Sequence, residues 1–394
     1  MIKHSSSFKR NSLAAAMLIA LAAPAVQAAD LNISGFLSVG GGMVDDDNET
    51  GANYGGYEED LTFDRSLLGL QVTGQVNEKV SATAQLIARK NDGYEVNAEW
   101  AYLTWQASDN IKLRGGRLRT PFYIYSDFLD VGYSYGWITP PREVYYLPFN
   151  NVDGVDLYAT QTLGIFDTSV QVYFGSFDDE FDLDGVTTDA KTRNQMGVAA
   201  TLGKDWWTLR AAYHETDLSV NVNGAILDPT SGLTLGQFLG SLPAQFSFVA
   251  PRVLVEEDKA SFTQIGFTID TGRFVAAAEH VEFEPENSLF AKNVREYVMG
   301  GVRAGSWLFH LTAARSDDEA VNLVEGIPAV PQTAVLIGTL NAIAEAQADK
   351  RDVISLGTRW DVASGVALKL QIDDVDDEVR GDQKVYSVAV QTVF

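Results

Sequence analysis

Basic and acidic side chains that could act on charged solutes fall in two parts of this 394-residue chain. The basic ones stand mostly on segments that alternate between apolar and polar residues, and the acidic ones lie in or just after one proline-rich segment. Arginines facing carboxylates across water would create a local field, and rings of charge usually set ion preference in a channel. The same groups could instead pair and pin the acidic segment, and both interpretations stay open. The basic set is Arg65, Arg89, Arg114, Arg117, Arg119, Arg193, Arg210, Arg359 and Lys369, and the second set is Asp127, Asp130, Arg142, Glu143 and Asp153.

The segment from Thr120 to Asn151 is too irregular for a helix or a strand. It holds four prolines, and aromatic residues are scattered from Phe122 to Phe149. Proline interrupts helices and strands, whereas disordered segments are poor in aromatics. An ordered connection of this length usually has a function. We therefore expect a constriction loop, residues 120–151, that folds into the bore of a β-barrel and narrows it.

Two details of this loop stay open. Its tyrosines either line a path for solutes or pack the loop against the wall. A bulge at Gly115–Gly116, just before the loop, would reverse the facing of the chain and turn Arg117 and Arg119 inward. The tyrosines concerned are Tyr123, Tyr125, Tyr133, Tyr145 and Tyr146.

Beyond its first residues, the chain alternates with a period of two. Leu31, Ile33, Leu37 and Val39 share one face of the first run, and polar residues occupy the other. This pattern is typical of strands with one apolar face. The strand-like runs are residues 31–44, 60–76, 79–90, 95–107, 110–119, 152–163, 166–177, 192–203, 205–218, 257–270, 272–284, 292–304, 306–317, 351–362, 365–376 and 383–394.

The connections between these runs alternate between seven tight turns and eight mostly longer loops. Most tight ones carry the Gly, Asn, Asp or Ser that hairpin turns use. Short turns at one rim and long loops at the other are typical of outer-membrane barrels, whose strand number is even. We predict an all-β fold, a transmembrane antiparallel up-and-down β-barrel of 16 strands, with lipid on the apolar face and water on the polar face. Short helices are expected in two long loops, at residues 333–347 and 233–242.

The first 28 residues predict a signal peptide. Lys3, Lys9 and Arg10 form a basic start, an apolar run follows, and Val26-Gln27-Ala28 fits the small-residue cleavage pattern. The domains are therefore a signal peptide, residues 1–28, and a barrel, residues 29–394. The absence of cysteine excludes disulfides and thiolate metal sites.

The chain ends in a strand whose outer positions include Tyr386, Val388, Val390 and the terminal Phe394. With the signal peptide, the sixteen runs and the long third loop, this ending resembles the porins of Gram-negative outer membranes, whose last strand typically ends in Phe. The resemblance implies a sixteen-stranded barrel, usually a homotrimer, for passive diffusion of small hydrophilic solutes and ions. It also implies location in the outer membrane of a Gram-negative bacterium, in contact with membrane lipid and lipopolysaccharide.

The main alternative is a substrate-selective anion channel, for phosphate or small carboxylates, with a ladder of arginines in the lumen. A net charge of −24 argues against a nucleic-acid partner, because proteins that bind nucleic acids are usually basic. Clusters of acidic residues in the loops lack the spacing of a calcium loop, so we predict no metal site and no cofactor.

An enzyme needs a catalytic constellation, and the sequence shows no motif for one. A pairing of His310 with Ser306 or Ser316 would be the nearest candidate for a barrel hydrolase. Binding of a partner by the long fifth and seventh loops is another alternative. We predict a protein that is not an enzyme.

Overall fold

The chain folds into a β-barrel in a computed structural model, which describes residues 30–46, 54–183, 186–228, 230–286, 288–378 and 381–394. The predicted signal peptide lies outside the described residues. The barrel strands are β1 Leu31–Asp46, β2 Leu67–Asn77, β3 Val80–Arg89, β4 Val96–Ser108, β5 Ile111–Arg119, β6 Asn151–Leu163, β7 Phe166–Leu183, β8 Val186–Lys204, β9 Trp207–Val220, β12 Val255–Asp270, β13 Phe274–Pro285, β14 Asn293–Ala304, β15 Trp307–Asp318, β16 Asp349–Ala363, β17 Val366–Asp377 and β18 Gln383–Val393.

These sixteen strands form one closed antiparallel sheet, in which each strand pairs with its neighbours along the chain. The last barrel strand, β18, pairs with the first, β1, and so closes the sheet. Gly35 and Phe394 exchange two backbone hydrogen bonds, of 2.8 and 2.9 Å, at this seam. The predicted fold class and strand number are confirmed.

Three strand boundaries differ from the predicted ones by six residues or more. β2 begins at Leu67 rather than at residue 60, because the preceding residues form turns and isolated bridges to β1 and within the loop. β7 and β8 continue past the predicted ends into a longer hairpin. In that extension a run of acidic residues, Asp178, Asp179, Glu180 and Asp182, interrupts the apolar alternation, so a search for alternation missed it.

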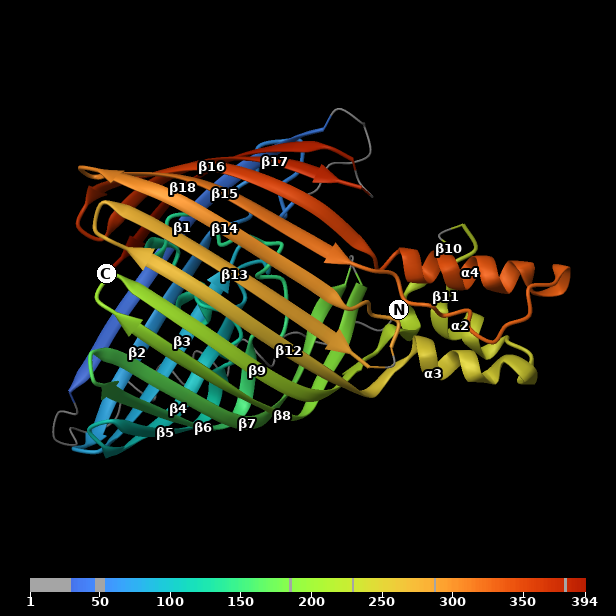
Figure 1. Cartoon of the computed structure of the whole chain (residues 1–394), viewed down its shortest axis with the longest axis horizontal. Helices are drawn as coiled ribbons and strands as arrows, with labels where there is room; N and C mark the ends of the chain where they lie inside the picture. The colour runs from blue at the N-terminus through green and yellow to red at the C-terminus, as the bar shows by residue number, and fades with distance from the viewer. Residues whose placement is uncertain (1–29, 47–53, 184–185, 229, 287, 379–380) are drawn as a thin grey trace.

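The long connections lie at one end of the barrel, where two of them form a small cap (Figure 1). The connection before β12 contains β10 Ile226–Asp228, β11 Leu233–Thr234, α2 Leu235–Gly240 and α3 Ala250–Val253, with 3-10 turns η3 Val222–Gly224 and η4 Ala244–Val249. The connection before β16 contains η5 Pro331–Thr333 and α4 Ala334–Glu345. The helix expected at 333–347 is confirmed, and the one expected at 233–242 is shorter. No helix among the described residues is long and apolar enough to cross a membrane.

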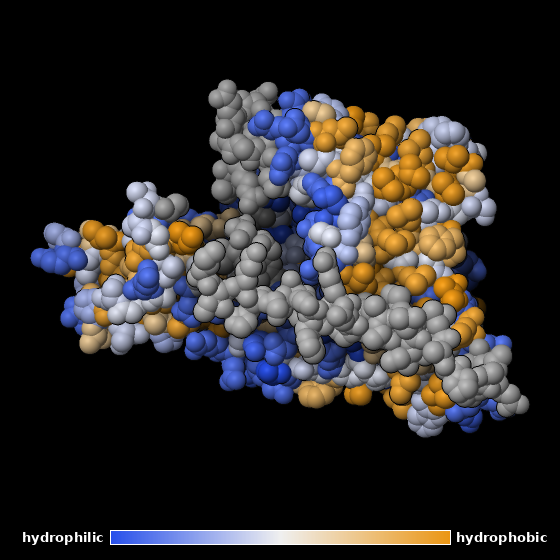
Figure 2. All heavy atoms as spheres, turned by 180° about the vertical axis from the view of Figure 1, so that it is seen from behind, coloured by the Kyte–Doolittle hydropathy of each residue, from blue (hydrophilic) through white to orange (hydrophobic). Residues whose placement is uncertain are grey.

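The outer wall of the barrel is largely apolar (Figure 2). Outward side chains such as Leu311, Leu356 and Leu370 are exposed, while their neighbours along each strand turn inside. The predicted rule that apolar faces point outward fails on β13. There Val281 and Phe283 are buried inside, and His280 of the same strand is outside.

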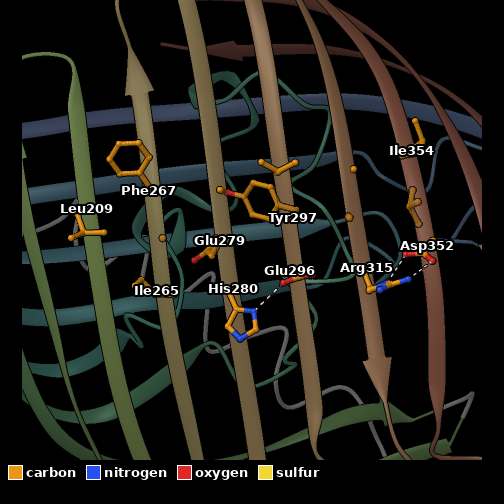
Figure 3. Close-up of a pocket in the computed structure, with 16 residues that line it drawn as sticks. Leu209, Ile265, Phe267, Glu279, His280, Glu296, Tyr297, Arg315, Asp352 and Ile354 are labelled. Atoms are coloured by element: carbon orange, nitrogen blue, oxygen red, sulfur yellow. Dashed lines mark hydrogen bonds and ion pairs between the residues drawn. The ribbon is translucent and has the colours of Figure 1, made fainter.

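A groove on this outer wall runs over β9 and β12–β16 and is crossed by a row of charged residues (Figure 3). His280 stands 3.1 Å from Glu296, and Arg315 donates two hydrogen bonds, of 2.8 and 2.9 Å, to Asp352. The four residues face one another across adjacent strands. Charges on the outer wall of a barrel cost little free energy near the membrane interface. This row therefore marks the loop-side edge of the apolar wall.

Three glycines stand side by side on the adjacent strands β5, β6 and β7. Gly116 faces Gly154, which faces Gly175. A β-carbon at Gly154 would lie 2.2 Å from the carbonyl oxygen of Phe174, a backbone atom that cannot move aside. The glycines are therefore needed for the strands to pack at this point.

We predict that Gly154→Ala destabilises the folded barrel by about 2 kcal/mol, because overpacking against backbone has a cost of this size. Unfolding in urea, followed by the loss of the heat-modifiable folded band in gel electrophoresis, measures the change. Gly300→Ala is the matched control, since a β-carbon at this strand glycine would meet nothing within 4 Å. Equal stability of the two variants would contradict the prediction.

Candidate functional site

The connection between β5 and β6, residues 120–150, is an ordered loop with its own packed core. It contains two short 3-10 turns, η1 Ser126–Phe128 and η2 Gly132–Ser134. Trp137 and Tyr123 are each only 1% exposed, and Val144 is fully buried. The tyrosines of this loop pack against one another and against the wall, as in the ring contact of 4.6 Å between Tyr123 and Tyr145. This packing favours the structural interpretation of the tyrosines.

The far side of this loop contacts strands about half-way round the barrel from β5 and β6. The indole N–H of Trp137 donates to the hydroxyl of Thr312 on β15 at 2.8 Å. Lys369 on β17 is buried and donates to three loop carbonyls, and Arg359 on β16 donates to two. The carbonyls that accept these bonds belong to Gly132, Tyr133, Tyr135 and Trp137. Two predicted pore-lining cations therefore bind the backbone of the loop.

The start of the loop is held by β9, β12 and β13. Glu279 accepts the backbone N–H of Ile124 at 2.8 Å, and it also accepts the hydroxyl of Tyr145 and the amide of Gln264. Arg210, a third predicted pore-lining residue, donates to the carbonyls of Pro121 and Phe122. Here too a wall side chain satisfies loop backbone.

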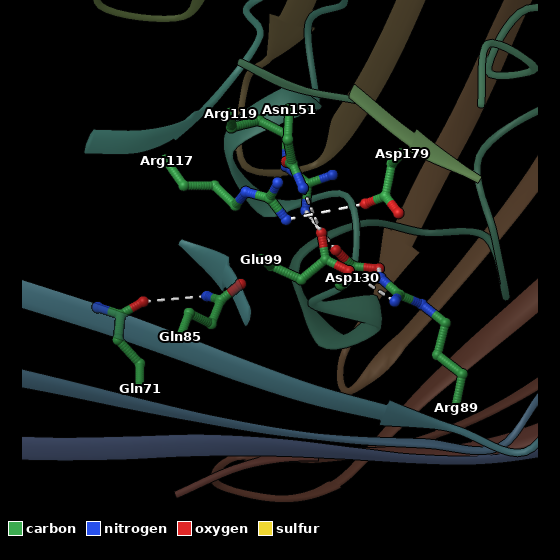
Figure 4. Close-up of polar contacts among 9 residues, drawn as sticks. All are labelled: Gln71, Gln85, Arg89, Glu99, Arg117, Arg119, Asp130, Asn151 and Asp179. Carbon is green, nitrogen blue, oxygen red and sulfur yellow. Dashed lines mark hydrogen bonds and ion pairs between the residues drawn. The ribbon is translucent and has the colours of Figure 1, made fainter. Parts of the chain in front are cut away.

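Four charged side chains meet where the loop passes β3, β4 and β5 (Figure 4). Arg89 donates to Glu99 at 2.6 Å and to Asp130 at 2.7 Å, and Arg119 donates to Asp130 at 2.5 Å. Asn151 donates to the second oxygen of Glu99 at 3.0 Å. Burial alone would raise the pKa of Asp130, but Arg119 and Arg89 together hold it below its usual value of 3.8. The carboxylate is thus charged and shared between two arginines.

Two further arginines on β5 pair with β6 instead of with the loop. Arg114 binds Asp156, and Arg117 forms two hydrogen bonds of 3.0 Å with Asp153. The strand pairing runs through Gly115 and Gly116 without a shift, so the expected bulge is absent. Asp153 was assigned to the loop from the sequence, but it is a residue of β6.

The remaining predicted residues are spread more widely. Arg193 pairs with Asp178 at 3.6 Å near the long-loop end of β7 and β8, away from the loop cluster. Asp127 is exposed and has no hydrogen bond or ion pair among the described residues. Glu143 is buried and accepts the hydroxyl of Tyr54 at 2.7 Å. Arg65 and Arg142 lie together beside Gly55.

The sequence did not single out three residues that hold the loop: Glu99, Glu279 and Thr312. Glu279 offers one signal, because it is an acid on an otherwise apolar strand face between Ala277 and Val281. An acid at such a position needs a partner. Thr312 carries no signal at all, since threonine is common in strands.

The imagined hydrolase pair does not form. His310 and Ser316 stand on the same strand, six residues apart, which corresponds to roughly 20 Å. Ser306 lies in the tight turn before that strand. His310 instead packs edge-on against Trp137 of the loop, with ring centres 6.0 Å apart.

A comparison with protein-family models matches residues 14–392 to a family described as Gram-negative porin. The chain belongs to the Gram-negative porin family. This membership and the closed sixteen-stranded barrel place the protein in the outer membrane, where the family forms channels.

Solved structures of other outer-membrane proteins share the fold of this porin at low sequence identity. OmpF of Salmonella typhi, solved in complex with daunomycin, superposes with a TM-score of 0.57 at 11% identity, covering 93% of this chain and 98% of OmpF. An anion-selective porin from Comamonas acidovorans superposes with a TM-score of 0.56 at 12% identity, covering 93% of this chain and 100% of that porin. A loop-deletion mutant of OmpT of Vibrio cholerae gives 0.57 at 12%, also covering 93% and 100%. No curated protein matches the chain.

In this porin, we predict that Asp130→Asn loosens the loop, because two arginines then lose their shared carboxylate. Breaking a largely buried ion pair from one side costs about 3 kcal/mol. Hydrogen exchange of the loop amides from Val131 to Ser134 should speed up markedly. Asp127→Asn is the matched control, because that exposed side chain has no partner in the described chain, and its exchange should stay as in the wild type.

We also predict how acid affects this ion pair. The folded pKa of Asp130 is lower than that of a free aspartate, so its stabilising contribution is complete above pH 3.8 and is lost as the pH falls through the lower folded value. The difference in unfolding free energy between wild type and Asp130→Asn should stay constant down to about pH 4 and shrink below it. A difference that already shrinks between pH 6 and pH 5 would contradict the assignment.

Proposed function

We propose that this porin is a water-filled channel for passive diffusion of small hydrophilic solutes and ions, and that residues 120–150 cross its lumen as the constriction. The observation that carries the proposal is a set of hydrogen bonds across the barrel: Lys369 and Arg359 donate to the loop, and Thr312 accepts from it, although the loop starts half-way round the barrel from these residues. A segment attached at both places must cross the interior of a closed barrel or its mouth. The inward facing and burial of these wall side chains support a crossing inside the interior.

The packing of the loop suggests where the open path runs. On the side of β12–β15 the loop and wall form a continuous apolar core. On the side of β5–β7 the charged side chains keep contact with water, with 28% of the Arg117 side chain and 49% of the Asp153 side chain exposed. We propose that solutes pass along this second, charged wall, beside the exposed Asp127.

The proposal includes three further features from the sequence. The first 28 residues act as an export signal, three copies assemble into a homotrimer, and the outer wall meets lipid and lipopolysaccharide. The apolar outer face and its edge of charged residues support the contact with lipid. The proposed function involves no chemical step and no cofactor.

Selectivity for anions is the second candidate. One specific observation favours it: Arg65 and Arg142 lie side by side without an acidic partner among the described residues. The other predicted cations are engaged with carboxylates, loop carbonyls or both.

Planar-bilayer recording tests the channel. The purified porin should give discrete current steps that are linear in voltage and do not saturate with potassium chloride concentration. A variant in which residues 124–146 are replaced by a short Gly-Ser linker should give larger steps and admit larger sugars in a liposome-swelling assay, because the constriction is gone. Equal step size and the same sugar cut-off in both proteins would contradict the assignment of the loop.

The reversal potential in a salt gradient tests ion preference. We expect a mild preference for chloride over potassium, because Arg65 and Arg142 carry positive charge that no described carboxylate meets in an ion pair. Clear selectivity for potassium would count against the anion candidate while leaving the channel itself in place.

A further inference from the structure

Arg65 and Arg142 differ from the other cations inside the barrel, because they face each other. Their terminal nitrogens both lie within 3.0 Å of the point where a β-carbon of Gly55 would stand. Neither guanidinium forms an ion pair or a hydrogen bond with any described residue. Arg65, which precedes β2, is half-buried, and Arg142 of the loop is exposed. Burial and the nearby Arg142 lower the pKa of Arg65 to about 10, so it remains charged at neutral pH.

The carboxylates around this pair are already engaged. Glu143 accepts the hydroxyl of Tyr54 at 2.7 Å and lies 3.8 Å from Arg351. Asp373 accepts the amide of Gln371 at 2.8 Å. Arg351, the third cation of the neighbourhood, binds Asp377 at 2.8 Å. Among the described residues, no carboxylate therefore forms an ion pair with Arg65 or Arg142.

Two tyrosine rings and a glycine hold the guanidiniums of Arg65 and Arg142 in position. Tyr57 lies under Arg65, and Tyr54 lies under Arg142, with ring centres 5.8 and 5.5 Å from the guanidinium carbons. Such rings hold a guanidinium in place while its N–H groups stay free. Gly55 adopts a φ of 75°, and a β-carbon there would collide with Arg142. The glycine thus makes the close approach of the two arginines possible.

We infer that Arg65 and Arg142, held by Tyr57 and Tyr54, form a binding site for a small oxyanion, the phosphate or carboxylate group of a solute. Guanidinium groups match the oxygens of both groups with paired, charge-assisted hydrogen bonds. One bound oxyanion would accept from both arginines and remove their mutual repulsion. The inference rests on the proposed channel and names the class of solute that it retains.

The site stands apart from the cluster of Arg89, Arg119 and Asp130. That cluster is neutralised by its own carboxylates and serves to anchor the loop. The oxyanion site lies instead where the first long loop meets residues 137–143 of the constriction loop, in a cavity also lined by Ser355 and Ser387 of the wall. The hydroxyl of Ser387 already donates to the carbonyl of Gln371 at 3.4 Å, and that of Ser355 bonds to Asp373, which also lines the cavity with Glu143. The donors for the anion are therefore the two guanidiniums.

The test uses single-channel currents of the full-length mature porin in potassium chloride, with increasing inorganic phosphate on one side. Phosphate should reduce the chloride current with a saturable dependence in the wild type. In Arg65→Gln and in Arg142→Gln the half-saturating phosphate concentration should rise about tenfold, as expected for the loss of one charge-assisted hydrogen-bonding partner. Arg142→Lys keeps the charge but not the paired donors, so its half-saturating phosphate concentration should lie between those of the wild type and of Arg142→Gln.

Controls and probes separate the possible outcomes. Arg315→Gln removes an arginine from the outer wall, so phosphate should reduce the chloride current of this variant as it does in the wild type. Acetate replaces phosphate in a second series: block by both probes assigns the site to oxyanions in general, and block by phosphate alone assigns it to phosphate. Each variant is first checked for the heat-modifiable folded band, so that loss of block is not loss of fold.

Two results would overturn the inference. One is a wild-type current that neither phosphate nor acetate reduces in a saturable way. The other is an unchanged half-saturating concentration in both Arg→Gln variants. Either result leaves the channel function standing, because chloride current is still measured. The absence of any current from the folded wild type would instead overturn the proposed function.

Discussion

Hydrocarbon supplies no hydrogen-bond partners, and each unpaired backbone group there costs several kcal/mol of free energy. For a chain that crosses a membrane by strands, this constraint requires that the sheet close on itself. The two backbone hydrogen bonds between Gly35 and Phe394 meet this requirement at the seam where the last strand pairs with the first. It also confines irregular backbone to the barrel ends or to places where other groups supply the missing hydrogen bonds.

The loop between β5 and β6 meets the same constraint in another way. Residues 120–150 make few regular backbone bonds, and much of the segment is buried. Several of their carbonyls and the amide of Ile124 instead bond to wall side chains, namely to Lys369, Arg359, Arg210 and Glu279. Three of the nine basic residues predicted to line the pore, Arg210, Arg359 and Lys369, are hydrogen-bond partners of the loop backbone.

The packing of the loop also explains why one simple rule of sequence reading failed. Alternation between apolar and polar residues located all sixteen strands, because hydrocarbon selects apolar side chains on the outer face. It predicted the facing of β13 wrongly, because the loop core presents a second apolar surface, on which Val281 and Phe283 pack. The sequence of one strand cannot show which of two apolar environments its apolar face meets.

The candidate site was predictable in composition but not in pairing. The arginines and the acidic loop residues stood out by type, yet their partners are set by contacts between residues far apart in sequence. Lys369 and Gly132 are 237 positions apart. No local pattern distinguished Arg89, which binds Asp130, from Arg65, which faces another arginine. The bulge at Gly115–Gly116 was wrong for a related reason: the glycines serve close packing of three strands, which only their neighbours reveal.

The electric field inside this porin therefore depends more on the charged side chains that lack a partner of opposite charge than on the total number of charged side chains. The chain carries a net charge of −24, and many of its carboxylates lie in the long loops. In physiological salt, exposed charges act over about 8 Å, so distant acidic loops contribute little to the electric field inside the barrel. An arginine in an ion pair with a carboxylate also contributes little to this field, because the pair is locally neutral. Two guanidiniums that face each other beside Gly55 are the exception, because no carboxylate among the described residues forms an ion pair with either of them.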